Sequence, residues 1–194
     1  MASSKPSASV AARLDIPEGT CALTYEPLDV QSIIQSVTDD GAGATAVFIG
    51  TTRNSFRGEA FEEHIIIAQP TTMLHAGKVV TRLDYQAYSK MAIKTMADIL
   101  RDAHSRYSRS DHQTAQSDAQ ASSLIRSAVH HRLGTVPVGE PSIVIAVSSP
   151  HRKEAFMACE LILEEVKMKA QIWKREFYEN EREEEAEWKV NAGH

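Results

Sequence analysis

The chain has 194 residues, of which 42% are hydrophobic, enough to bury one core and too few for two large domains. Its formal net charge of -5 gives no overall basic field, so the electrostatic attraction that drives nucleic-acid binding has no obvious source. No apolar run approaches the roughly 20 residues that a membrane-spanning helix needs. Cys21 and Cys159 form no CxxC or Cys/His spacing, which argues against a metal site or disulfide framework and fits a reduced, cytoplasmic setting.

Residues 1–18 are predicted to be a disordered N-terminal extension. Residues 1–14 are rich in Ser and Ala and contain no acidic residue, which superficially resembles an organelle transit peptide. The segment shows little amphipathic periodicity, which favours a disordered extension over a transit peptide.

Two strands and one helix are predicted next. Residues 20–25 alternate apolar and polar residues as a strand does, and Asp29 then caps a helix. The apolar face of this helix is formed by Val30, Ile33, Ile34 and Val37. Residues 44–50 are a continuous apolar run, typical of a buried strand, and they lead into a polar loop that contains Arg53. Loops at strand ends often carry functional residues.

The middle of the chain predicts a strand pair and a long helix. Residues 61–67 and 79–85 have strand patterns and are expected to pair with each other. A helix is predicted over residues 89–107. Its apolar stripe is Ala92, Met96, Ile99 and Ala103. Residues 108–123 are polar and lack periodicity, which indicates a mobile loop or an insertion.

The last third predicts another strand pair, residues 125–132 and 142–149, followed by a helix over residues 150–177. The buried stripe of that helix is expected to be Phe156, Cys159, Leu163, Val166, Ala170 and Trp173. Residues beyond 178 are acidic and read as a solvated tail. Because strands and helices mix without regular βαβ repetition, the predicted class is α+β, with a mixed or antiparallel sheet covered by helices.

The start of the predicted last helix carries positive charge where a helix normally favours negative charge. Pro150 suits the first helical position, and His151, Arg152 and Lys153 follow it directly. Cations at this end cost a few tenths of a kcal/mol to about 1 kcal/mol each. A bound anion such as phosphate would reverse that effect, whereas side chains that splay into water would simply reduce it. Both interpretations stay open on this feature alone.

Lys167 and Lys174 are seven residues apart and would share one face of the predicted helix. Two cations on one face can bind one ligand, and a lysine beside another cation can act as a base or a nucleophile. The alternative is ordinary surface pairing, because Glu164 precedes Lys167 by three residues and Glu165 precedes Lys169 by four.

Other chemical signatures are missing. His130 and His131 are adjacent, and a strand would send them to opposite faces, so they cannot share a metal ion. The sequence has no phosphate loop, dinucleotide fingerprint, HExxH or GxSxG motif. The residues alone therefore predict an anion-binding α+β domain with a lysine pair.

Several separated motifs, in order, resemble the large, catalytic subunit of molybdopterin synthase. They are FIGTTRN (48–54), LDYQAY (83–88) with MA (91–92), HRLG (131–134) with GE (139–140), VSSPHR (147–152) and KMKAQIWKRE (167–176). Three features depart from the family pattern: Gln171 replaces a common proline, residues 59–78 are longer than usual, and residues 108–123 are inserted.

The resemblance implies an α/β-hammerhead-like catalytic domain over residues 19–178, with an acidic tail over residues 179–194. It implies a sulfurtransferase of molybdenum cofactor biosynthesis. A homodimer would bind two small ubiquitin-like subunits to form a heterotetramer. Sulfur would pass from the small subunit's C-terminal Gly-Gly thiocarboxylate to cyclic pyranopterin monophosphate, giving molybdopterin. No cofactor, nucleic acid or membrane is expected to take part.

The family's functional positions fall on residues already singled out. The resemblance implies that Lys167 and Lys174 are catalytic. The implied substrate-binding residues are Arg53, His151, Arg152, Lys167, Lys174, Arg175 and Glu176. His151 and Arg152 would reach the substrate from the neighbouring protomer. The alternative function is a non-catalytic module that binds a ubiquitin-like tail or a phosphometabolite.

Overall fold

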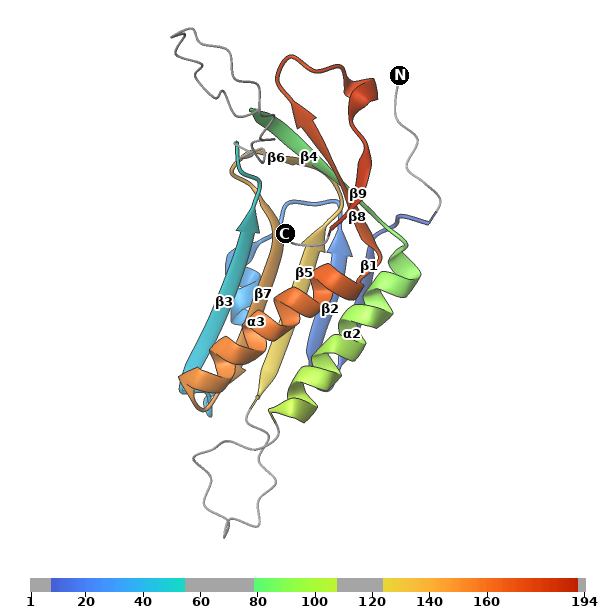
Figure 1. The fold of residues 1–194 in the computed structure, drawn as a ribbon. Helices are drawn as coiled ribbons and strands as arrows, with labels where there is room; N and C mark the ends of the chain where they lie inside the picture. The colour runs from blue at the N-terminus through green and yellow to red at the C-terminus, as the bar shows by residue number, and fades with distance from the viewer. Residues whose placement is uncertain (1–7, 55–78, 108–123, 192–194) are drawn as a thin grey trace, which may run out of the picture.

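A computed structural model describes residues 8–54, 79–107 and 124–191, which form two sheets and three α-helices (Figure 1). The larger sheet has the strand order β1-β2-β5-β7-β3, and the smaller has the order β6-β4-β8-β9. The elements are β1 (Ala12–Ile16), β2 (Gly19–Thr24), α1 (Val30–Gln35), β3 (Ala44–Thr51), β4 (Val80–Ala87), α2 (Ser89–Arg106), β5 (Arg126–Arg132), β6 (Gly134–Pro137), β7 (Pro141–Ser149), α3 (Arg152–Lys169), β8 (Ile172–Tyr178), the 3-10 turn η1 (Glu183–Glu185) and β9 (Trp188–Val190). The predicted α+β class is confirmed.

The larger sheet is mixed, because β2 and β5 run parallel while its other neighbours are antiparallel. The predicted pairing of residues 125–132 with 142–149 is confirmed as β5 with β7. Both α2 and α3 cover one face of this sheet, and α1 packs on the other (Figure 1). Since β7 is therefore covered on both sides, eight of its nine residues are buried.

The two helices predicted before the last third are confirmed. Asp29 caps α1, where its side chain accepts a hydrogen bond of 3.0 Å from the backbone N–H of Ser32. The whole predicted stripe of α2 is buried, namely Ala92, Met96, Ile99 and Ala103. No helix in the described ranges is long and apolar enough to cross a bilayer.

The predicted last helix, residues 150–177, is wrong at both ends. Helix α3 begins at Arg152 and ends at Lys169, and the backbone of Ala170 is extended. Residues 172–178 form β8, which pairs with β4 and β9. The apolar residues up to Trp173 recur every three or four positions by coincidence, which continued the helical pattern. The residues after Trp173 alternate between the two faces of a strand. Phe156, a predicted core residue, is 66% exposed.

Both chain ends contribute strands that the sequence did not predict. Residues 12–16, assigned to the disordered extension, form β1 and pair antiparallel with β2. Residues 188–190, assigned to the acidic tail, form β9 and pair with β8. Each strand is short and gains its stability from pairing with a neighbour, which local sequence does not reveal. Residues 1–7 and 192–194 lie outside the described residues.

Two strand assignments also need correction. Strand β3 is an edge strand whose Val47 and Ile49 are exposed, so its apolar run is not buried on both faces as predicted. Strand β4 hydrogen-bonds with β6 and β8. Its predicted partner, residues 61–67, lies outside the described residues, as do the whole of the proposed insertions 59–78 and 108–123.

Gly19 is the first residue of β2, directly after the turn from β1, and its substitution should strongly destabilise the fold. A Cβ there would lie 1.7 Å from the carbonyl oxygen of Ser127, and the residue has a φ of 151°. We expect Gly19→Ala to lower the free energy of unfolding by more than about 3 kcal/mol, or to prevent folding, in urea titrations. Gly139→Ala is the control: its φ is 85° but its Cβ would meet nothing within 4 Å, so about 1–2 kcal/mol is expected. Equal losses would contradict this account.

Candidate active site

Lys167 and Lys174 flank the turn between α3 and β8. Lys167 lies in the last turn of α3 and Lys174 is the third residue of β8, so the shared helical face predicted for them is wrong. Three helical and four extended residues limit their Cα separation to roughly 18 Å, and the turn at Ala170 shortens it. The two lysines therefore stay at one end of the molecule on different elements.

The alternative to a ligand-binding role was that Lys167 and Lys169 form surface ion pairs with Glu164 and Glu165. Only one of these two ion pairs is present. Lys169 forms an ion pair with Glu165, as the spacing predicts. Glu164 does not pair with Lys167, whose half-buried side chain makes no hydrogen bond or ion pair with any described residue. Of Lys167 and Lys169, Lys167 is thus the one whose ammonium group is available to a ligand.

Lys174 is held by a buried carboxylate. Its Nζ lies 3.0 Å from Oε1 of Glu176, whose side chain is only 8% exposed. The other oxygen, Oε2, accepts a hydrogen bond of 2.5 Å from the hydroxyl of Tyr178 and lies 3.8 Å from Nζ of Lys189. Burial alone would raise the pKa of Glu176, but Tyr178 and the two lysines hold it below its ordinary value. Glu176 is therefore a counter-ion for two lysines.

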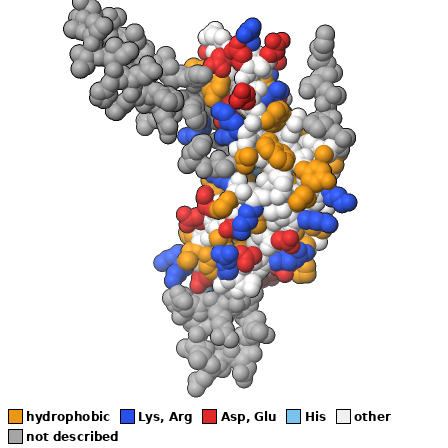
Figure 2. All heavy atoms as spheres, turned by 45° about the vertical axis from the view of Figure 1, so that its right-hand side comes forward, with side chains coloured by type: hydrophobic (Ala, Val, Ile, Leu, Met, Phe, Trp, Pro, Cys, Tyr) orange, Lys and Arg blue, Asp and Glu red, His pale blue; other side chains and the backbone are white. Residues whose placement is uncertain are grey.

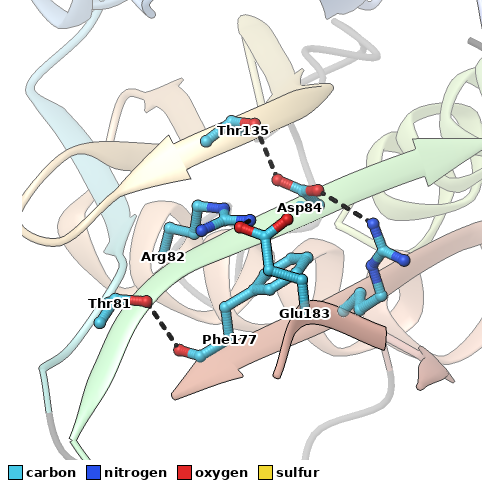
Figure 3. A network of polar contacts seen from close by, with 7 residues as sticks. Thr81, Arg82, Asp84, Thr135, Phe177 and Glu183 are labelled. Carbon is cyan, nitrogen blue, oxygen red and sulfur yellow. Dashed lines mark hydrogen bonds and ion pairs between the residues drawn. The ribbon is translucent and has the colours of Figure 1, made fainter. Parts of the chain in front are cut away.

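Arg175 lies on the opposite face of β8 from Lys174 and Glu176, because successive strand residues alternate. Its guanidinium stacks over the rings of Phe177 and Trp188, at 4.7 Å and 5.0 Å from their centroids. It also lies 3.4 Å from Asp84, which accepts a hydrogen bond from Thr135 (Figure 3). Arg175 thus ties β4, β8 and β9 together, and its predicted contact with substrate stays a prediction.

A buried histidine anchors the chain just after β9. His131 Nδ1 donates to the carbonyl of Arg132 at 2.8 Å, which leaves Nε2 to accept from the side-chain amide of Asn191 at 3.3 Å. Complete burial lowers the pKa of His131 to about 4, so the ring is neutral and this tautomer fits both bonds. The backbone N–H of Asn191 also donates to Ile172 at 3.2 Å. These bonds hold β9 beside the start of β8.

The remaining predicted site residues are divided between the two ends of the larger sheet. Arg53 is exposed just beyond the end of β3, where the next residue, Asn54, accepts a hydrogen bond of 2.9 Å from Val80 at the start of β4. His151 and Arg152 are exposed at the start of α3, beside the other end of β3 (Figure 1). Fifteen residues of helix place Arg152 about 22 Å from Lys167. One chain alone therefore does not bring all the predicted residues together.

Two other features of the described residues lie apart from the predicted site residues or give no metal site. Charged side chains of both signs are interspersed over the face shown in Figure 2. No group of three or more His, Cys, Asp or Glu in the described ranges could hold a metal ion. A cavity of about 220 Å³ lies between α1 and the larger sheet, near Arg13, Asp29 and His130, and none of the predicted site residues lines it.

Comparison with known proteins decides the family. The sequence model of the MoaE protein family matches residues 23–169, about three quarters of the chain. The chain belongs to the MoaE family. The match includes Arg53, His151, Arg152 and Lys167, while Lys174, Arg175 and Glu176 lie just beyond it. The match thus includes the lysine in the last turn of α3 and ends before the segment that begins β8.

Several curated relatives are named as molybdopterin synthase catalytic subunits. A molybdopterin synthase catalytic subunit from Pyricularia oryzae is 40% identical over 169 residues, which cover 87% of this chain and 72% of that protein. The molybdopterin synthase catalytic subunit 2 of Aedes aegypti is 37% identical, with 87% of each chain covered. The Drosophila melanogaster relative is 36% identical, and this chain spans 36% of its length.

Solved structures share the fold. Molybdopterin synthase from Staphylococcus aureus superposes with a TM-score of 0.63 at 26% identity, covering 89% of this chain and 96% of that one. A complex of subunits 1 and 2 of molybdopterin-converting factor from Helicobacter pylori gives a TM-score of 0.55 at 17% identity, covering 84% and 87%. The second likeness shows the fold alone.

Sequence reasoning missed Lys189 and Tyr178, both of which contact Glu176. The available signal for Lys189 was the alternation of Trp188, Lys189 and Val190, which is too short to distinguish a strand from a tail. Tyr178 was placed beyond the predicted helix, where nothing indicated that it shares a strand face with Glu176.

Replacing Glu176 by Gln should reveal its role as a counter-ion. Glu176→Gln keeps the shape but leaves Lys174, 24% exposed, without its carboxylate, so we expect the free energy of unfolding to fall by about 2–4 kcal/mol at pH 7. Because its folded pKa is lowered, this contribution is present at neutral pH and lost as the pH falls below 4.5. Urea titrations at pH 7 and pH 4 measure both effects.

The control is Glu183→Gln. Glu183 pairs with Arg82 at 2.6 Å, but its side chain is 73% exposed, so less than about 1 kcal/mol should be lost. Similar losses for the two variants at pH 7 would show that Glu176 is not held as described.

Proposed function

We propose that this chain is the catalytic subunit of a molybdopterin synthase. It would transfer sulfur from the C-terminal Gly-Gly thiocarboxylate of a small ubiquitin-like partner to cyclic pyranopterin monophosphate, making the dithiolene of molybdopterin. The observation that carries the proposal is the lysine pair at the turn between α3 and β8, in a chain of the MoaE family. The names of the curated relatives support it, as does the fold shared with molybdopterin synthase from Staphylococcus aureus.

The contacts suggest different tasks for the two lysines. Lys174 is held in place by Glu176 and serves as a fixed positive charge, which suits binding of an anionic substrate. Lys167 has no described partner, so its Nζ is assigned to proton transfer or to transient capture of the thiocarboxylate carbonyl. Arg53 and Arg152 would help to neutralise the substrate phosphate.

Sulfur arrives on the partner in this proposal, so the chain needs neither a cysteine nucleophile nor a resident cofactor. Burial raises the pKa of Cys21 to about 12 and that of Cys159 to about 11, which disfavours their reactive thiolates. Each sulfur transferred breaks the C–S bond of one partner terminus, which returns as a carboxylate with an oxygen from water, so two partner molecules are used per dithiolene. Two buried, free cysteines also fit the cytoplasm, where we place the reaction.

Lys167→Ala tests the central role. In a reconstitution with thiocarboxylated small subunit, conversion of cyclic pyranopterin monophosphate should fall at least about 100-fold, the usual size of an acid–base contribution. Lys94→Ala is the control, because Lys94 is exposed on α2. Substantial dithiolene formation by folded Lys167→Ala would refute the assignment and favour a module that binds the partner without catalysis.

The separation of Arg152 from Lys167 predicts a site shared between two copies of the chain. A heterodimer of one Lys167→Ala protomer and one Arg152→Ala protomer, purified with two different tags, would contain one site free of both substitutions. We expect about half of the wild-type activity, although each variant homodimer is impaired. Failure of the heterodimer to recover activity would show that Arg152 does not serve the lysine of another protomer.

A further inference from the structure

Two lysines face each other across the C-terminal hairpin. In the antiparallel pair β8–β9, Lys174 is directly opposite Lys189. Residues in this position have their Cβ atoms about 5 Å apart on one face of the sheet, and like charges there destabilise the pair. The arrangement therefore calls for negative charge beside both ammonium groups.

Glu176 supplies only part of that charge. It contacts Lys174 closely, at 3.0 Å, but Lys189 only at 3.8 Å, near the outer limit of an ion pair. Two lysines and one carboxylate leave a net charge of about +1. The side chain of Lys189 is 56% exposed, so its ammonium group still has hydrogen-bond donors accessible to a ligand.

The position of Lys189 is fixed by contacts on both sides of it in sequence. Trp188 stacks with Arg175, and Asn191 hydrogen-bonds with Ile172 and with the buried ring of His131. These contacts are made by side chains and backbone other than Lys189 itself. The hairpin is thus held by contacts besides that of the Lys189 ammonium group, which lies 3.8 Å from Glu176.

We propose that Lys189 is a third anion-binding lysine of the active site, which together with Lys174 holds the phosphate of the pterin substrate. This inference rests on the function proposed above. A cyclic phosphate carries one negative charge, which balances the cluster, and its two free oxygens can each accept from one ammonium group. The partner's thiocarboxylate is also a monoanion, and the experiment distinguishes the two.

The test uses the chain in complex with thiocarboxylated small subunit, comparing wild type with Lys189→Met, Lys189→Arg and the exposed control Lys94→Met. Lys189→Met should raise KM for cyclic pyranopterin monophosphate about tenfold and leave kcat within about twofold. Lys189→Arg should restore most of the loss. The effect should shrink in 0.5 M salt, because an exposed charge is screened.

Several outcomes would reject the proposed role of Lys189. An unchanged KM for the pterin, a raised KM for the small subunit instead, or an equal effect of Lys94→Met would each reject the proposal. Inorganic phosphate, titrated while lysine side-chain NMR signals are followed, gives a readout that needs no turnover. If wild type is inactive, the proposed function fails, yet weaker phosphate binding by Lys189→Met would still support this site. Equal phosphate binding by both proteins would overturn it.

Discussion

The pairing of β8 on both of its sides is the constraint on which the candidate site depends. Because β4 and β9 hydrogen-bond with its two edges, the chain must leave α3 at Ala170 and continue as a strand. That change of direction places Lys167 on a helix and Lys174 on a sheet. It also places Lys174 and Glu176 on one strand face, where an ion pair between alternate residues can form.

The fold was predictable from sequence wherever an element carries its own periodicity. The stripe of α2 and the cap at Asp29 are local signals, and both were predicted correctly. Strands β1 and β9 are too short to carry such a signal and depend on neighbours distant in sequence. The predicted end of α3 was wrong for a related reason. The residues up to Trp173 continue a helical spacing, and only the pairing of β8 makes Ile172 and Trp173 part of a strand.

The residues of the candidate site stay a prediction, and the structure tests only their geometry. The family resemblance predicts roles for Lys167 and Lys174, whereas the physical argument that joined them on one helical face was wrong. Spacing could not show that Arg175 turns away from Lys174, because that follows only from the strand. Lys189 was missed since its relation to Lys174 exists only across the β8–β9 pair.

The start of α3 carries a cation whose proposed role in the site requires a second copy of the chain. Helix dipole effects fall off within the first turn, which also contains the acidic residue Glu154, of the type that this end favours. Arg152 is exposed on the same turn and is not needed to stabilise it. About 22 Å of helix separate it from Lys167. A cation held so far from the lysines of its own chain can contribute to their chemistry only if a second copy brings its helix start to them.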